Sequence, residues 1–182
     1  MNEIQMKKYV FRMLLMTVAL LSLSQCLIAQ QYNQRLTNNK TNEEILIGLC
    51  TRNAFLEKPF ENWFTQEYNL YRNIMDKSIC DSLKPLMKNI RITIVLGTWC
   101  SDSRQQVPDF FTIADYLNMP DSVITIICVD RDKQAVAFSI EDKKIELVPT
   151  FIIYRQGAEI GRIIETPSKS LEKDLLAILK TK

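Results

Sequence analysis

Short apolar runs alternate with amphipathic stretches through the second half of the chain. The runs at 92–96 and 123–129 are apolar on consecutive positions and rich in β-branched residues, which is typical of strands buried on both faces. Between them, apolar residues recur at helical spacing and predict a helix that Pro108 bends early. The positions on this helical face are Val107, Phe110, Phe111, Ala114 and Leu117.

The same pattern continues to the end of the chain. Residues 132–140 are compatible with a short crossover helix, and two further strands are predicted at 151–154 and 158–164, joined by a turn at Gln156-Gly157. Ser168 or Ser170 is placed to cap a final helix with one apolar face. Alternation of strands and helices predicts an α/β fold: a central mixed sheet with helices on both faces.

Residues 30–89 precede this core, and we expect them to form an N-terminal helical extension to a domain at 90–182. Thr41 and Glu44 have the spacing of a capping box, and 78–88 predicts another helix. An aromatic-rich stretch lies between these two helices. Because aromatic side chains mostly contribute to cores, we expect this stretch to pack the extension onto the domain rather than to bind substrate. Its members are Phe55, Phe60, Trp63, Phe64, Tyr68 and Tyr71.

Residues 1–29 have the pattern of a secretory signal peptide. Lys7, Lys8 and Arg12 precede the apolar run 13–23, and Ala29 supplies a small residue at the cleavage site. The apolar run is short for a membrane span. We therefore predict a periplasmic or secreted protein. Lipid anchoring at Cys26 is the less favoured alternative, because the bulky Gln25 precedes it.

Charge and composition exclude several classes of function. The leader contains three basic residues and one acidic residue, and the remaining 153 residues contain 20 of each, so no nucleic-acid or anionic-membrane partner is expected. The chain has no histidine, which excludes Cys-His proteases, Ser-His-Asp hydrolases and histidine-ligated zinc. The cysteines are too far apart for a metal knuckle. We expect neither a metal nor another cofactor.

Cys100 is the main candidate for chemistry. It lies where the strand at 92–96 gives way to the amphipathic helix. Unpaired backbone N–H groups and the positive end of the helix dipole favour a thiolate at such a position, and the thiolate is the nucleophile. Burial as a small hydrophobic residue is the alternative, because most free cysteines have that role.

The run around Cys100 resembles the active-site turn of the thioredoxin-like superfamily. Trp99-Cys100-Ser101-Asp102-Ser103 matches its Trp-Cys-x-x-Cys pattern except at the last position. Pro108 matches a helix proline of that family, and Val148-Pro149-Thr150 is similar to its cis-proline loop. The resemblance covers residues 90–182. It implies a thioredoxin-like fold, Cys100 as nucleophile, and a substrate-binding surface formed by Trp99, Val148 and Pro149.

Two departures from the family pattern bear on mechanism. Ser103 replaces the second cysteine, and Ile94 occupies the position of a buried acid. A serine cannot release a mixed disulfide, but its hydroxyl can donate a hydrogen bond to a thiolate. The resemblance therefore implies thiol–disulfide exchange with protein or small-molecule thiols and disulfides through one cysteine. An outside thiol or Cys128 resolves the adduct, although buried packing at a strand end is the favoured role for Cys128. Asp102 and Arg104 flank the site. Arg104 is able to favour the thiolate, but a solvated arginine or a structural pair with a nearby aspartate is the favoured interpretation.

Two other functions remain open. A lone thiolate with a neighbouring arginine is able to reduce peroxide, although the peroxiredoxin motif is missing before Cys100. A thioredoxin-like module that binds an extended peptide without catalysis also fits the loss of the second cysteine. A disulfide between Cys50 and Cys80 is one pairing that the extension allows. The sequence alone does not choose among the three complete pairings of the four cysteines at 50, 80, 100 and 128.

Overall fold

A computed structural model describes residues 5, 6, 8, 11–13, 32–37, 42–136 and 139–181. Two compact units are distinguished, residues 1–32 and 33–182, and all six strands belong to the second. Most of the predicted signal peptide, including Cys26 and the expected cleavage site, falls outside the described residues. Within the described part of the chain, no helix combines the length and the hydropathy needed to cross a bilayer.

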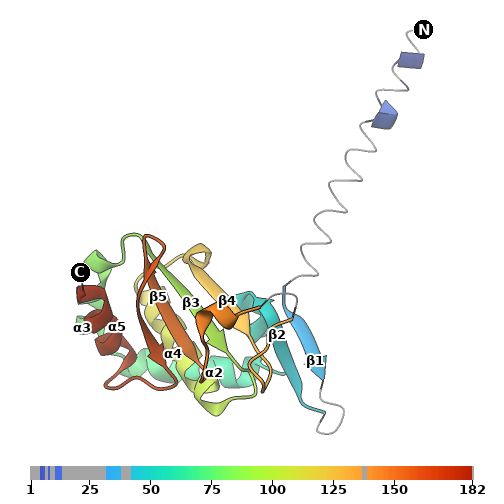
Figure 1. Cartoon of the computed structure of the whole chain (residues 1–182). Coiled ribbons are helices and arrows are strands. Elements are labelled where there is room, and N and C mark those ends of the chain that lie inside the picture. Colours follow the sequence, from blue (N-terminus) through green and yellow to red (C-terminus); the bar gives the residue numbers. More distant parts are fainter. Residues whose placement is uncertain are drawn as a thin grey trace. The chain divides into compact units, whose positions relative to one another are not determined.

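A six-stranded mixed sheet forms the centre of the second unit (Figure 1), in the order β1-β2-β4-β3-β5-β6. The strands are β1 (Gln34–Thr37), β2 (Glu44–Cys50), β3 (Ile90–Leu96), β4 (Ile124–Cys128), β5 (Thr150–Arg155) and β6 (Ala158–Ile164). β3 runs parallel to β4 and antiparallel to β5, and the other neighbouring strands are antiparallel.

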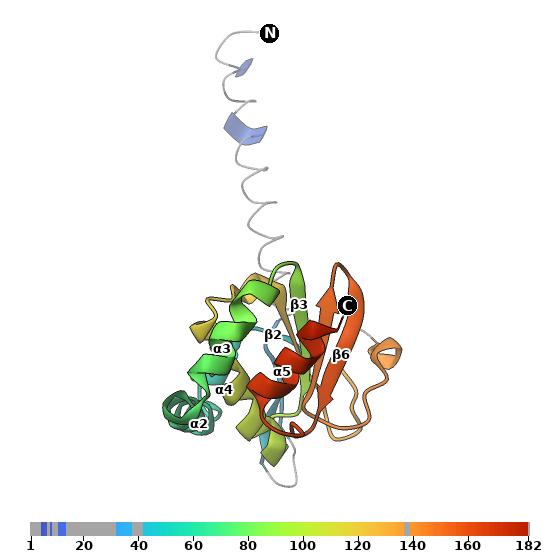
Figure 2. The ribbon, with the colours of Figure 1, turned by 90° about the vertical axis from the view of Figure 1, so that its left-hand side faces the viewer.

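Helices flank this sheet, and the arrangement is consistent with a thioredoxin-like α/β fold. They are α2 (Glu61–Ile74), α3 (Lys77–Leu83), α4 (Ser101–Tyr116) and α5 (Leu171–Lys180). In Figure 2, α3 and α5 lie in front of the strands. Single 3₁₀ turns occur at Arg52–Leu56, Lys84–Leu86, Asp121–Val123 and Glu141–Lys143.

The two faces of the sheet bury separate apolar clusters, because neighbouring side chains on a strand point to opposite faces. Ile126 and Cys128 of β4 join the larger cluster, which contains the buried residues of α2, α3, α4 and α5. Ile127 of β4 and Val95 of β3 join a smaller cluster with Ile140 and Val148. The helices therefore cover one face, and the segment between β4 and β5 covers the other.

The predicted strands and the last helix are confirmed within a few residues. Ser170 is the cap of α5, and its hydroxyl accepts a hydrogen bond from the Lys173 N–H at 3.3 Å. Gly161 of β6 lies beneath this helix: a Cβ there would lie 2.9 Å from Cγ2 of Ile178. Close packing of α5 on β6 therefore depends on the missing side chain.

The prediction of a helix that begins at Thr41 is wrong. Thr41 itself is outside the described residues, and Glu44 starts strand β2. Gly48 in this segment has a φ of +81°, which does not fit a helix, and β2 pairs with β1 on one side and β4 on the other. In the described part of the region between β2 and β3, the 3₁₀ turn at Arg52–Leu56 comes first and α2 and α3 follow, and the segment before it supplies β1 and β2 to the sheet.

The crossover helix predicted at 132–140 is also absent from the described residues of that segment. The Asp130 carboxylate accepts hydrogen bonds from the backbone N–H groups of Asp132 and Gln134, at 3.0 and 2.8 Å. Such side-chain bonds compete with helical ones and hold a turn instead. The expectation of helices on both faces fails here, because this irregular segment replaces the second layer.

The aromatic stretch packs the extension onto the core, as predicted. Phe55, Phe60 and Phe64 are at most 2% exposed. Phe64 lies against Phe55 and against Phe111 of α4, with ring centroids 5.5 and 6.0 Å apart. The aromatic residues therefore join α2 to α4 rather than form a free surface.

Replacing Ser170 by alanine removes the cap of α5. We expect the free energy of unfolding, measured in urea, to fall by about 1 kcal/mol. Ser82→Ala is the matched control, because the Ser82 hydroxyl only bonds back to the Ser78 carbonyl within α3; its effect should be close to zero. Equal losses in the two variants would contradict the capping role.

Candidate functional site

Cys100 occupies the N-cap position of α4, directly after the turn that follows β3. Its N–H donates to the Gly97 carbonyl at 2.9 Å, and its own carbonyl accepts from the Arg104 N–H at 3.0 Å. No side chain caps the first turn of α4. The half-buried thiol therefore lies at the positive end of the helix, as the sequence predicted.

Two oxygen atoms lie near the Cys100 sulfur. The thiol donates to the Val148 carbonyl at 3.2 Å, and Oδ2 of Asp102 is 3.9 Å from Sγ. The Val148–Pro149 peptide bond is cis. Cys100, Asp102, Val148 and Pro149 are thus brought together, although 48 residues separate Cys100 from Val148.

Backbone and side-chain bonds hold the Val148–Pro149 loop in place. The Thr150 hydroxyl donates to the Leu147 carbonyl, and the Glu165 N–H donates to the Pro149 carbonyl, both at 2.7 Å. Pairing of β3 with β5 places Val95 opposite Thr150. The loop therefore faces Cys100, because the end of β3 and the start of β5 are adjacent in the sheet.

Trp99 lies across the turn beside Cys100. Its indole N–H donates to the Val129 carbonyl at 2.9 Å, and the Arg131 guanidinium stacks on its ring at 4.9 Å. Glu43 pairs with Arg131 at 3.0 Å and with Arg104 at 3.5 Å. Glu43, in the segment before β2, is thereby linked both to α4 through Arg104 and to the residues after β4 through Arg131.

Sequence reasoning missed the roles of Glu43 and Arg131. In the sequence Glu43 lies only within a predicted helix start, and Arg131 belongs to no predicted element or motif. Neither belongs to a local motif, because their partners are 61 to 88 residues away in the chain. No signal in a single sequence identifies such a bridge.

Ser103 and Arg104 both form hydrogen bonds to the backbone of the turn before α4. The Ser103 side chain is fully buried, and its hydroxyl accepts a hydrogen bond from the Gly97 N–H at 3.3 Å. Arg104 donates through Nε to the Thr98 carbonyl at 2.6 Å and extends to Glu43. In this geometry both side chains support the turn at 97–100, and the sulfur contacts come from Asp102 and Val148.

The other described cysteines are buried and free. Burial raises the pKa of the Cys80 thiol to about 12, with Glu172 adding to the effect. Burial and then the neighbouring Cys50 thiol raise the pKa of Cys128 well above its usual value. Cys50 and Cys128 both belong to the cluster beneath the helices, whereas Cys100 packs against the smaller cluster on the other face. Cys128 is therefore placed beside Cys50 rather than beside Cys100.

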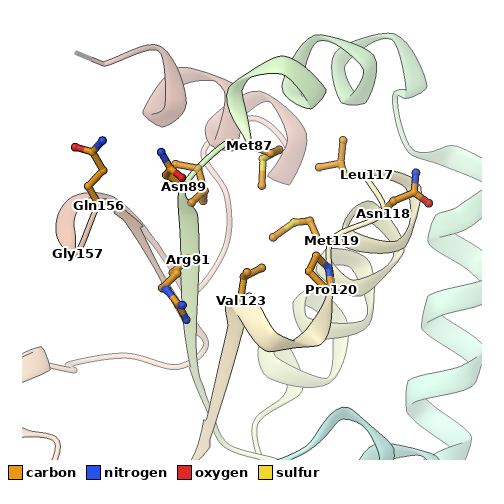
Figure 3. A pocket seen from close by; sticks show the side chains of 11 residues that line it. Met87, Asn89, Arg91, Leu117, Asn118, Met119, Pro120, Val123, Gln156 and Gly157 are labelled. Atoms are coloured by element: carbon orange, nitrogen blue, oxygen red, sulfur yellow. The ribbon is translucent and has the colours of Figure 1, made fainter.

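A separate pocket of about 700 Å³ lies around the start of β3 (Figure 3), away from the thiol at the other end of that strand. Its lining includes Met87, Arg91, Leu117 and Met119, and none of the candidate site residues. Within the described ranges, no group of three or more acidic or cysteine side chains is arranged to hold a metal ion.

Comparison with known proteins adds little to this geometry. No family model and no curated protein matches the chain. A Pseudomonas aeruginosa protein of unknown function is 12% identical over 65% of this chain and 84% of its own, with a TM-score of 0.47. An HIV epitope-scaffold protein is 11% identical over 66% and 87%, with a TM-score of 0.48. A Malassezia sympodialis thioredoxin is 19% identical over 54% and 84%, with a TM-score of 0.31.

Replacing Gly97 by alanine should displace Trp99. A Cβ at Gly97 would lie 2.5 Å from Cε2 of the indole, so the ring must leave the Val129 carbonyl. In a Trp63→Phe background Trp99 is the one remaining tryptophan. We expect Gly97→Ala to shift its emission to longer wavelength and to increase quenching by acrylamide.

Gly157→Asn in the same background is the control. A Cβ at Gly157 meets nothing within 4 Å, and asparagine tolerates its positive φ of +86°. This variant should keep the parent spectrum. An unchanged spectrum for Gly97→Ala would show that the ring does not depend on the space above Gly97.

Proposed function

We propose that this is an extracytoplasmic thioredoxin-like protein that performs thiol–disulfide exchange through a single cysteine, Cys100. One observation carries the proposal: the half-buried Cys100 thiol lies at the N-terminus of α4, 3.2 Å from the carbonyl that precedes Pro149. Helix N-termini favour the thiolate needed for attack. Export rests on the signal-peptide pattern of residues 1–29.

The proposed reaction begins when Cys100 loses its proton. The thiolate attacks one sulfur of a substrate disulfide, a new S–S bond forms, and the substrate S–S bond breaks. The departing sulfur leaves as a thiolate and takes up a proton from solvent. Loss of the thiol proton also frees the Val148 carbonyl, which then accepts a hydrogen bond from a substrate backbone N–H lying along the loop.

Release of the mixed disulfide requires a second thiol. Ser103 is buried and has no sulfur to supply, and Cys128 lies in the cluster on the other face of the sheet. A small-molecule or protein thiol from outside is therefore the resolving partner in this proposal. Its thiolate attacks the Cys100 adduct, regenerates Cys100 and carries away the substrate half as a new disulfide.

The two other functions are less well supported by the geometry. A peroxidatic site benefits from a cation at the sulfur, but Arg104 donates to Thr98 and pairs with Glu43, while a carboxylate of Asp102 faces the sulfur. A non-catalytic binding module would use the same Val148–Pro149 loop. Reactivity of the Cys100 sulfur separates that module from an exchange enzyme.

Cys100→Ser should abolish exchange because it removes the attacking sulfur. The assay follows reduction of a dye-labelled peptide disulfide with glutathione as the second thiol. We expect the rate of Cys100→Ser to fall to background and that of Cys128→Ala to stay within about twofold of the parent. A lost rate in Cys128→Ala, with the fold intact by circular dichroism, would contradict a single-cysteine mechanism.

Ser103→Cys should convert the site to one that resolves its own adduct. Without glutathione, the parent protein should accumulate a Cys100–peptide adduct, visible by intact mass, whereas Ser103→Cys should release the peptide and form an internal disulfide. Ser101→Cys is the positional control, since residue 101 is exposed. If the parent forms no adduct at all, the exchange proposal fails and the binding module is favoured.

A further inference from the structure

Asp109 is an unusual residue in the middle of α4. Its side chain is 3% exposed, and Oδ1 has no hydrogen-bond partner. A buried carboxylate without partners is costly, whereas the protonated acid is tolerated. The proposed exchange reaction makes no use of this group.

The groups that face Asp109 are acidic. Glu67 of α2 lies next to it, and Glu172 of α5 is close enough to act on it electrostatically. Glu172 is 1% exposed and accepts hydrogen bonds from the Tyr71 hydroxyl at 2.9 Å and the Asp76 N–H at 3.0 Å. Cys80 of α3 is a further titratable neighbour of Tyr71 and Glu172, and Asp76, Asp81 and Lys84 in turn act on Cys80.

These carboxyl groups have no basic partner. Among the ion pairs formed by described residues, none includes Asp109, Glu67 or Glu172. Burial first, and then the charge of Glu67, raise the pKa of Asp109 to about 8. At neutral pH Asp109 therefore keeps its proton, and the carboxyl group of Glu67 is the neighbour that acts on it most strongly.

We propose that the proton on buried Asp109, next to Glu67 of α2, is a latch that holds α2 against α4, so that α2 opens more readily as the pH rises. When α2 is closed, Asp109 is buried and protonated. When α2 moves away, water reaches Asp109 and the proton leaves. In this step the O–H bond of the Asp109 acid ionises: the electron pair stays on the carboxylate, the proton goes to solvent water, and no other bond changes.

The direction of the pH dependence of α2 opening follows from the number of protons that the open and closed forms bind. An open, solvated Asp109 has an ordinary pKa near 3.9, so between about 4 and 8 the open form binds one proton fewer than the closed form. Opening is then favoured by up to about tenfold for each unit of pH within this range. Above about 8 both forms are ionised, and the dependence ends.

Opening of α2 would change the surface close to Cys100. Trp63 of α2 lines a depression of about 540 Å³ together with Phe60, Glu43 and Arg104. Arg104 is in the first turns of α4, and Glu43 also holds Arg131 over Trp99. A latch on α2 therefore controls one wall of the surface beside Cys100.

Hydrogen–deuterium exchange of the full chain tests the latch. Exchange of α2 amides is measured from pH 5 to 9 and divided by the intrinsic rate at each pH. We expect the opening of α2 to increase with pH up to about 8 and then to level off, with β3 amides as the internal reference. A flat profile for α2 in the parent protein would overturn the proposal.

Asp109→Asn removes the proton while it keeps the shape, and its amide N–H₂ is able to donate to Glu67. This variant should lose the pH dependence of α2 opening. If the same slope persists in Asp109→Asn, another group is responsible and the latch is refuted.

Asp115→Asn is the matched control from the same helix. Asp115 accepts hydrogen bonds from Arg52 and from the Tyr68 hydroxyl of α2. Its loss should raise α2 opening by a similar factor at every pH above 5 and leave the slope unchanged. Loss of the slope in this variant would show that α2 responds to general weakening rather than to the Asp109 proton.

Discussion

Burial of α4 between the sheet and α2 is the constraint on which the rest of the structure depends. Ten of the sixteen residues of α4 are buried, and Phe110 and Phe111 join it to Phe151 of β5 and Phe64 of α2. A helix enclosed on both sides cannot shift without opening a cavity in the core. Its N-terminus, and with it Cys100, is therefore held in a fixed position.

The candidate site joins two segments that are distant in sequence. Residues 97–104 provide the thiol and the helix terminus, and residues 147–150 provide the facing loop. Antiparallel pairing of β3 with β5 brings them together, since it sets Val95 opposite Thr150. The Cys100 sulfur lies at the N-terminus of α4, where the helix dipole is positive, and two hydrogen-bond acceptors are near it: the Asp102 carboxylate and the Val148 carbonyl. The proposed exchange reaction uses this arrangement.

Two aspartates on α4 show how neighbours decide protonation. Burial alone would raise the pKa of Asp115, but hydrogen bonds from Arg52 and Tyr68 outweigh it and the pKa is lowered. Asp109, two turns earlier, is buried beside Glu67 and has no cation, so its pKa is raised. Both carboxyl groups have a neighbour on α2: the Tyr68 hydroxyl donates to Asp115, and Glu67 lies beside Asp109.

The sequence by itself determined the local elements of the core: the apolar β-branched runs, the cap at Ser170, and the junction that places Cys100 at the start of a helix. These depend on periodicity and on contacts a few residues apart. It did not reveal that 44–50 is a strand, or that the described residues of 132–140 form no helix. Pairing with β4 and the turn bonds of Asp130 decided those segments. The contacts of Cys100 with Val148, of Glu43 with Arg131, and of Asp109 with Glu67 were decided by the tertiary structure alone. Each joins residues that only strand pairing or helix packing brings within reach.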